Sequence, residues 1–440
     1  MRATVFALAV SLAAAQAVTD AEQEKLNIAS QADRARSAFT RAYQTEAGEL
    51  TAEYPKFAEQ MNDYKYKWEA FDVKSSDGYD LTMFRIVGKN GYEWYKPSRP
   101  EHPVLIMNGF MADGTSWFEI GGLDFGNSKN APLPTALFDA GFDVFIGNPR
   151  GSPQSNKAND SSVAYWDFGL DGLNEDVKAF ISSIKTATEN ENATINYVGM
   201  NVGNTQMFYG LANGDAALKK DIHKFVALTP CVTPAKWALD TLRDETGAPI
   251  DGDSYMTTEI LRDGLIANFQ SYPNTYGPGY SSSFVMQSLG PRFYSTSLSY
   301  YGEENFNPLY SEASSGVRPI SNKLWIHLLE AGINQRLGVW DEAYMTDPVG
   351  TELSAVDLSK VDVPVSLLFG GAGALCPADT NMEALDKLPN VERKVKYDNL
   401  GDQNFYRTDP EILADVITIL GSGAYSLVAA ATALTMLSAL

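Results

Sequence analysis

Residues 196–205 read Asn196-Tyr197-Val198-Gly199-Met200-Asn201-Val202-Gly203-Asn204-Thr205. A short apolar run leads into two glycines spaced four residues apart, and residues 202–213 are a helix candidate. This pattern predicts a tight turn from a strand into a helix, because small residues on both sides let the central side chain stand over the sheet. Asn201 takes that central position.

The same alternation extends along the chain from Trp68 onward. Short apolar runs alternate with helical stretches, which is typical of a mostly parallel sheet covered on both faces. We expect strands at 104–107, 143–146, 196–199, 225–228 and 365–369. We expect helices at 131–140, 171–187, 202–213, 379–388 and 409–420. The sequence therefore predicts an α/β fold.

One long interval interrupts this alternation. The stretch from Leu228 to Val365 is too long for a crossover and is rich in Tyr, Ser, Gly and Pro. We therefore expect an inserted cap or lid domain at 236–344, with a lid loop at 276–283. The other expected parts are an N-terminal helical segment at 18–65, with a helix at 20–46, and a core made of 66–235 and 345–421.

Several longer motifs surround the turn. Asp77-Gly78-Tyr79-Asp80-Leu81-Thr82-Met83-Phe84-Arg85-Ile86 has the form DGYxLxxxRI. Asp139-Ala140-Gly141-Phe142-Asp143-Val144 and Gly147-Asn148-Pro149-Arg150-Gly151 follow, and then Tyr165-Trp166-Asp167-Phe168. From about Tyr66 to Leu420 the chain resembles the acid lipase family of animal gastric and lysosomal acid lipases. The resemblance implies an α/β-hydrolase fold, with a mostly parallel central sheet and an inserted cap, and it implies hydrolysis of triacylglycerols or steryl esters.

The resemblance also locates the catalytic positions, and each holds a different residue. The family's Ser maps to Asn201, its Asp to Gly373 and its His to Asn399. Acyl transfer requires a hydroxyl nucleophile, an imidazole that accepts its proton and a carboxylate that orients the imidazole. An Asn amide is neither a base nor a useful nucleophile. We therefore expect a pseudolipase with no catalytic residues.

An active ester hydrolase with a non-standard nucleophile is the alternative. Cys231, or a serine of the cap, is the candidate nucleophile. The histidines do not fit a catalytic role: His102 and His223 precede their strands, at the sheet edge opposite the ligand crevice. His327 lies in an apolar helical stretch, where a structural role fits better.

Parts of the site that bind rather than react are retained. The resemblance places the backbone amides of Phe110 and Val202 where the oxyanion hole is built, and a backbone donor needs no particular side chain. A neutral lipid or an acyl ester is the expected ligand. Alternatively, Gly199 and Gly203 are present only because the tight turn needs them. The expected role is lipid metabolism or lipid binding.

Composition limits the other classes of partner. The chain has 34 Lys and Arg against 55 Asp and Glu, a net charge of −21, which repels phosphate backbones. Nucleic acid is therefore not an expected partner, and the sequence does not identify a protein partner. With 3 His and 2 Cys there is no cluster from which a zinc site could be built, so neither a metal nor a cofactor is expected.

Both termini carry targeting patterns. Residues 1–17 have a basic start, an apolar stretch and Ala15-Gln16-Ala17, which predicts a signal peptide. Asn159 and Asn192 begin Asn-x-Ser/Thr triplets and are expected to be glycosylated in a secreted chain. The expected location is the secretory pathway, with delivery to the cell exterior or a lysosome-like compartment. The apolar tail, 422–440, fits a lipid-anchor signal that attaches the chain to the cell-surface membrane, a tail helix or an inert end.

The two cysteines are expected to form a disulfide. Cys231 follows the strand 225–228, and Cys376 comes shortly after the strand 365–369. The family's strand order makes these strands neighbours, and a disulfide spans the distance between adjacent strands with modest loop adjustment. Two buried free thiols are the alternative, which a secreted chain tolerates less often.

Overall fold

The structure of the protein is a computed structural model. It describes residues 53–89, 97–109, 112–119, 132–156, 160, 162–235, 238–239, 256–257, 259, 262–266, 320–348, 350–373, 375–402, 404–407 and 409–421. The chain divides into two compact units, Met1–Ala58 and Glu59–Leu440, and the central sheet belongs to the second. Outside the described residues lie the expected signal peptide at 1–17, helix at 20–46, lid loop at 276–283 and tail at 422–440, together with Phe110 and Asn159.

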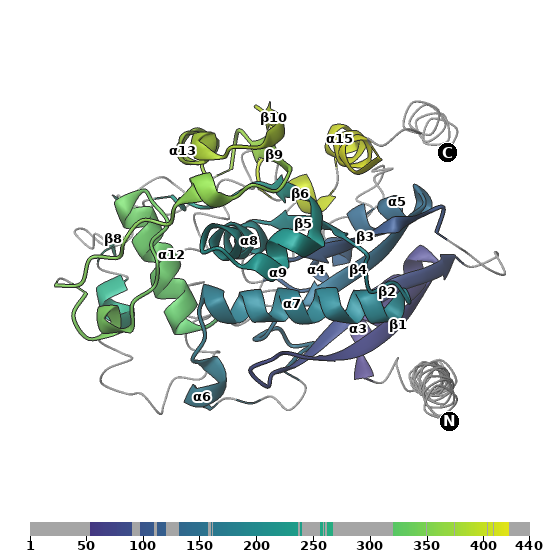
Figure 1. Cartoon of the computed structure of the whole chain (residues 1–440), viewed down its shortest axis with the longest axis horizontal. Coiled ribbons are helices and arrows are strands. Elements are labelled where there is room, and N and C mark those ends of the chain that lie inside the picture. The colour runs from purple at the N-terminus through teal and green to yellow at the C-terminus, as the bar shows by residue number, and fades with distance from the viewer. Residues whose placement is uncertain are drawn as a thin grey trace, which may run out of the picture. The chain divides into compact units, whose positions relative to one another are not determined.

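The described residues form an eight-stranded sheet in the order β1-β2-β4-β3-β5-β6-β9-β10 (Figure 1). β2 pairs antiparallel with both β1 and β4, and the other neighbouring strands are parallel. The strands are β1 (Tyr66–Lys74), β2 (Asp80–Lys89), β3 (Arg99–Met107), β4 (Phe142–Asn148), β5 (Ile195–Met200), β6 (Ile222–Leu228), β9 (Val365–Gly370) and β10 (Val391–Tyr397). The five expected strands are all present, and they are the central ones.

Burial explains why the sequence predicts these central strands. Every residue of β4, β5 and β9 is buried, as a parallel sheet covered on both faces requires. Short runs of mostly apolar residues result. β10 instead alternates exposed and partly buried positions, because it lies at the edge of the sheet.

The helices that cover the sheet follow from the handedness of the crossovers. β4 and β5 lie on opposite sides of β3, so right-handed crossovers place α5 on one face and α7 and α8 on the other (Figure 1). α7 packs against α8, and α15 packs against α5. The helices are α3 (Pro55–Tyr64), α4 (Ser116–Glu119), α5 (Leu133–Asp139), α6 (Val163–Trp166), α7 (Leu170–Ala187), α8 (Val202–Ala212), α9 (Ala216–Asp221), α12 (Asn322–Asn334), α13 (Ala378–Ala384), α14 (Asn404–Arg407) and α15 (Pro410–Gly421), with 3-10 turns at Glu342–Met345, Leu358–Lys360 and Leu385–Lys387.

The interval expected to form the cap adds no described strand to the central sheet. Its described residues include β7 (Ala238–Leu239) and β8 (Met256–Thr257), which pair antiparallel in a sheet of their own. They also include α12, whose Ser321 N-cap accepts a hydrogen bond from the Leu324 amide. The domain boundaries at 236 and 344 stay a prediction. Among the described residues, every helix is too short or too polar to cross a membrane.

Candidate functional site

The turn between β5 and α8 holds Asn201 in an unusual backbone conformation. Its φ is 41° and its ψ is −106°, a region that non-glycine residues rarely adopt. The flanking glycines permit the close approach of neighbouring chain. A Cβ on Gly203 would lie 2.8 Å from the carbonyl oxygen of Asn108, and one on Gly199 would lie 3.0 Å from the amide nitrogen of Asn204. The turn is therefore the strand-to-helix elbow that the sequence predicts.

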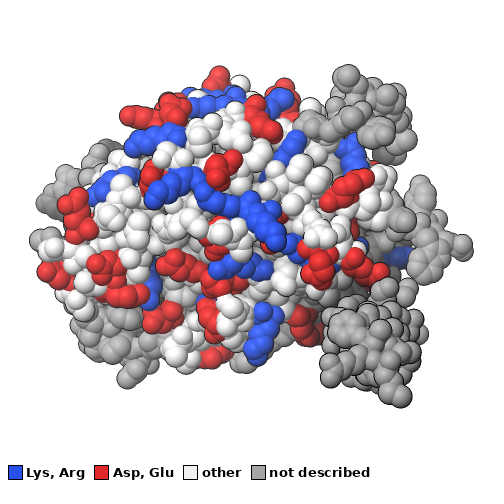
Figure 2. All heavy atoms as spheres, viewed as in Figure 1, with Lys and Arg blue, Asp and Glu red and all other residues white. Residues whose placement is uncertain are grey.

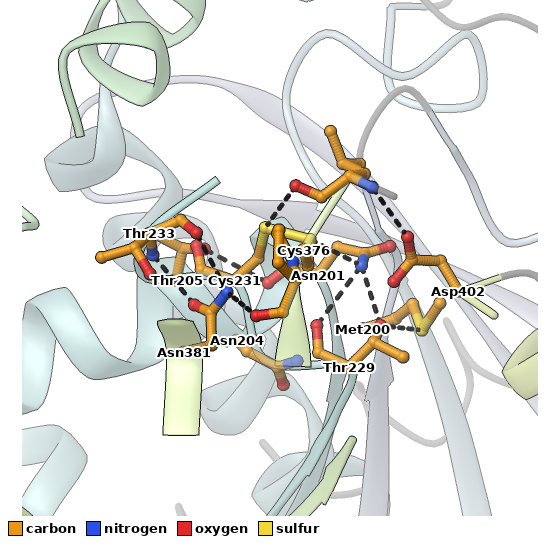
Figure 3. Close-up of a disulfide and its surroundings, with 12 residues drawn as sticks. Met200, Asn201, Asn204, Thr205, Thr229, Cys231, Thr233, Cys376, Asn381 and Asp402 are labelled. Carbon is orange, nitrogen blue, oxygen red and sulfur yellow. Dashed lines mark hydrogen bonds between the residues drawn. A yellow bond between two sulfur atoms is a disulfide. The ribbon is translucent and has the colours of Figure 1, made fainter. Parts of the chain in front are cut away.

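The side chain of Asn201 is tied to the ends of two neighbouring strands. Asn201 is 4% exposed. Its Nδ2 donates to Oγ1 of Thr229 at 2.8 Å and to Sγ of Cys376 at 3.2 Å (Figure 3). Thr229 directly follows β6, and Cys376 lies in the loop after β9. The carboxamide thus bridges the strand ends by hydrogen bonds.

Cys231 and Cys376 form a disulfide beside the elbow. The S–S distance is 2.06 Å and the two Cα atoms are 5.0 Å apart. Both residues are buried, and the bond joins the segments that follow β6 and β9 (Figure 3). Because its sulfur is bonded, Cys231 has no free thiolate. The alternative in which Cys231 is the nucleophile is therefore wrong for the oxidised protein.

The positions assigned to the family's Asp and His differ in their surroundings. Gly373 lies in the loop after β9, close to the elbow disulfide, while Asn399 is exposed in the turn after β10. Asp379 and Asp398 are also exposed, and Asp379 pairs with Lys396. Asn399 thus faces solvent, whereas Asn201 is 4% exposed.

A residue that the sequence analysis does not single out comes closer. Asp402, three residues after Asn399, directs its carboxyl towards the elbow and the disulfide (Figure 3). Its Oδ2 accepts a hydrogen bond from the amide of Leu375 at 3.2 Å. Its Oδ1 is buried and has no hydrogen-bond partner among the described residues. A Cβ on Gly373 would lie 2.8 Å from this Oδ1, so Asp402 and Gly373 are in direct contact.

Burial raises the pKa of Asp402 to about 6, because the charged form loses its hydration. The amides of Leu375 and Cys376 and the side chain of Asn201 oppose this effect but do not cancel it. The only advance signal was an acidic residue in the loop after the last strand, and that signal is weak.

The three histidines lie away from the elbow. The rings of His102, on β3, and His223, on β6, stack with centroids 3.6 Å apart. Both come near the start of their strands, whereas Asn201 follows the end of β5. His327 is fully buried in α12 and its Nε2 donates to the carbonyl of Gly338 at 2.8 Å. All three are described residues, and none supplies an imidazole to the site.

A small pocket lies over the elbow, with α12 as one wall. Its volume of ≈ 20 Å³ is room for about one water molecule. Val202 begins α8, so its N–H is among those that a helix leaves without an intrahelical acceptor. The lining residues are Asn201, Val202, Cys231, Pro234, Ala235, Trp325, Leu328, Leu329 and Leu375. Asn201 is the single polar side chain among them.

Two further expectations concern the surface and metals. Asn192 is exposed in the turn after α7, where a glycan would meet solvent. In the part of the chain that the structure describes, no three His, Cys, Asp or Glu side chains are grouped so that they could hold a metal ion.

Comparison with known proteins places the chain among lipases. Residues 57–121 match the family described as a partial alpha/beta-hydrolase lipase region. Gastric triacylglycerol lipase of Rattus norvegicus is 32% identical over 344 residues, which cover 74% of this chain and 80% of that protein. Lysosomal acid lipase/cholesteryl ester hydrolase of Homo sapiens is 32% identical over 196 residues, 43% of this chain and 46% of that protein.

Among solved structures, an esterase from Exiguobacterium antarcticum aligns with a TM-score of 0.46 and 14% identity, over 80% of this chain and 99% of that one. The strand order, the elbow after β5 and the extent of the match to the gastric enzyme agree. The chain belongs to the acid lipase family of α/β hydrolases.

Proposed function

We propose that this protein is a secreted member of the acid lipase family that binds a neutral lipid or an acyl ester and does not hydrolyse it. One observation carries the proposal. The apex of the elbow is Asn201, whose carboxamide is held by Thr229 and Cys376. A hydroxyl nucleophile is absent from this position.

The chemistry of acyl transfer explains why this loss is decisive. The nucleophile, the base and the carboxylate act as a unit, and loss of the nucleophile or the base alone lowers kcat by about 10⁶ in a serine hydrolase. Here Asn201 replaces the nucleophile, and none of the three histidines lies at the site. Backbone donors alone give only a residual rate of about 10³ to 10⁴ over water.

Binding of an apolar ligand is supported by the pocket over the elbow. Eight of its nine lining residues have apolar side chains, counting the bonded Cys231. The names of the rat and human relatives specify triacylglycerol and cholesteryl ester as what those enzymes act on. An acyl chain does not fit into ≈ 20 Å³, so its binding requires the pocket to widen.

Three features support a role in the secretory pathway, outside the cell or in a lysosome-like compartment. The first is the signal-peptide pattern at 1–17. The second is the Cys231–Cys376 disulfide, since such bonds persist in oxidising compartments. The third is the exposure of Asn192 in its glycosylation triplet.

The test uses the purified mature chain with short- and long-chain fatty acyl esters and a serine-reactive phosphonate. We expect the protein to bind a fluorescent long-chain acyl ester that the unlabelled ester displaces saturably. We expect no release of fatty acid and no covalent labelling of the protein by the phosphonate. Turnover together with labelling of one cap serine would support the alternative of an active hydrolase. Absence of both binding and turnover would leave a scaffold without a ligand and would contradict the proposal.

A further inference from the structure

The loop after β10 carries one side chain into the vacated catalytic region. We infer that Asp402, and not Asn399, holds the place of the imidazole that a lipase of this fold uses. This inference rests on the proposed loss of hydrolysis, and it identifies the residue that now fills the base position.

Strand order gives the first argument. In α/β hydrolases the nucleophile, the acid and the histidine occur in that order along the chain, on loops that gather at one sheet edge. Here Asn201 follows β5, Gly373 follows β9 and Asp402 follows β10. Asn399 follows β10 as well, so order alone does not separate it from Asp402.

Contacts separate the two candidates. Asn399 is exposed, whereas Asp402 touches Gly373 and accepts a hydrogen bond from the amide of Leu375. The 2.8 Å between a Gly373 Cβ and Oδ1 of Asp402 means that a longer side chain at 373 would meet the side chain at 402. In an active triad, the carboxylate and the imidazole meet in this way.

The chemistry of the site fits a former base position. There the carboxyl of Asp402 has lost its hydration, and the amides of Leu375 and Cys376 and the side chain of Asn201 do not compensate for that loss, so its pKa is raised. A catalytic imidazole needs the same partly dry environment beside the nucleophile. Asp402 closes this space and links the loops that follow β9 and β10.

Imidazole titration by NMR tests the placement without any need for activity. The chain has only 3 other His, so the signal of one introduced imidazole is resolvable. In Asp402→His, addition of Gly373→Asp should raise the pKa of the new imidazole by about 1 to 3 units, because an opposite charge in contact favours its protonated form. In the matched pair based on Asn399→His, addition of Gly373→Asp should change the pKa of the new imidazole little.

A larger shift at 399 than at 402, or no shift at either position, would overturn the inference. Hydrolysis by the wild-type chain would contradict the proposed function instead, and it would leave this comparison intact. The two failures are therefore distinguishable.

Labelling by a serine-reactive phosphonate gives a second readout. The variant Asn201→Ser/Gly373→Asp/Asp402→His should be labelled at position 201. The matched variant Asn201→Ser/Gly373→Asp/Asn399→His should not be labelled, because Asp402 then faces the new carboxylate at 373. The opposite pattern would overturn the inference.

A double-mutant cycle covers the case in which the multiple variants do not fold. Gly373→Ala places a methyl group against Oδ1 of Asp402, so its effect on unfolding should shrink when Asp402→Ala is also present. Combined with Asn399→Ala, its effect should be additive. Additivity with Asp402→Ala would overturn the inference.

Discussion

At the elbow, Asn201 keeps the backbone conformation of a nucleophile without its chemistry. A residue held in a sparsely populated φ/ψ region costs of order 1–3 kcal/mol, and it persists only when its surroundings enforce it. The surroundings here are the two close glycine contacts and the hydrogen bonds to Thr229 and Cys376. The fold itself therefore holds the strained turn with Asn201 at its apex.

Asn201→Ser alone should not restore hydrolysis. The new hydroxyl has no imidazole to accept its proton, and members of a triad act as a unit. We expect release of fatty acid from a short-chain ester at the wild-type rate, and no phosphonate label. Clear activity of this variant would show that a base is already present, and Asp402 would then be the residue to remove next.

Asp402 should make stability depend on pH. Its folded pKa of about 6 lies above the value of about 3.9 for an unfolded Asp, so folding favours the protonated form. Its contribution is complete below about pH 4 and is lost as pH rises through about 6, by up to about 3 kcal/mol.

Urea unfolding of the wild type and of Asp402→Asn, at about pH 4.5 and about pH 7.5, measures this contribution. The wild type should lose stability relative to the variant at the higher pH. Asp398→Asn, at an exposed position in the same loop, is the control. A constant difference between wild type and Asp402→Asn across this range would contradict the assigned shift.

The position of Asn201 is predictable from the sequence, because a tight strand-to-helix turn requires small residues on both sides of its central residue. The position of Asp402 is not predictable in this way. Matching a motif residue by residue gives positions along the chain, but it does not give the path that a loop takes in space. Three residues separate Asn399 from Asp402. After Tyr397 the chain leaves Asn399 exposed, whereas Asp402 is partly exposed and buries its Oδ1. Only the folded structure distinguishes the two residues.

At the level of elements, predictability followed burial. Each of the five central strands contains a short run of buried, mostly apolar residues, and all five strands were expected. β1, β2 and β10 were not, because they lie at or near the edges and carry charged residues such as Glu69, Arg85 and Lys394. The role of α12 as a pocket wall was not expected. The spacing of apolar residues can predict a helix, but it does not show where that helix lies relative to the sheet.

The wall formed by α12 yields a prediction about ligand binding. Leu329 lines the pocket and Leu324 does not, although both are buried leucines of this helix. Leu329→Ala should enlarge the pocket and tighten binding of a long-chain acyl ester, by about four-fold for each methylene newly accommodated. Leu324→Ala should leave the affinity unchanged.

Both variants should lower the free energy of unfolding by about 2 to 5 kcal/mol, so loss of stability alone cannot mimic the difference. Displacement of a fluorescent acyl ester measures the affinity, and thermal unfolding checks the fold. Equal affinities of the two variants would mean that the ligand does not enter beside Leu329.

Across the whole molecule, the net charge of −21 coexists with local neutralisation. Figure 2 shows a band of basic side chains with acidic groups beside it on one face. Pairs such as Lys178–Asp215 at 3.0 Å and Lys219–Asp362 at 3.2 Å contribute little individually, because they are partly exposed. The Cys231–Cys376 disulfide, in contrast, joins distant parts of the chain covalently.

The disulfide should be among the largest contributions to stability that one chemical change can remove. It joins residues 145 positions apart, so in the chain-entropy model it stabilises the fold by about 4 to 5 kcal/mol. Cys231→Ser/Cys376→Ser should lower the free energy of unfolding by up to that amount, and reduction of the wild type should match the variant. The bond also encloses the interval of the expected cap, so its loss should loosen both cap connections and weaken acyl-ester binding. Alkylation of two thiols in the unreduced wild type would contradict this account.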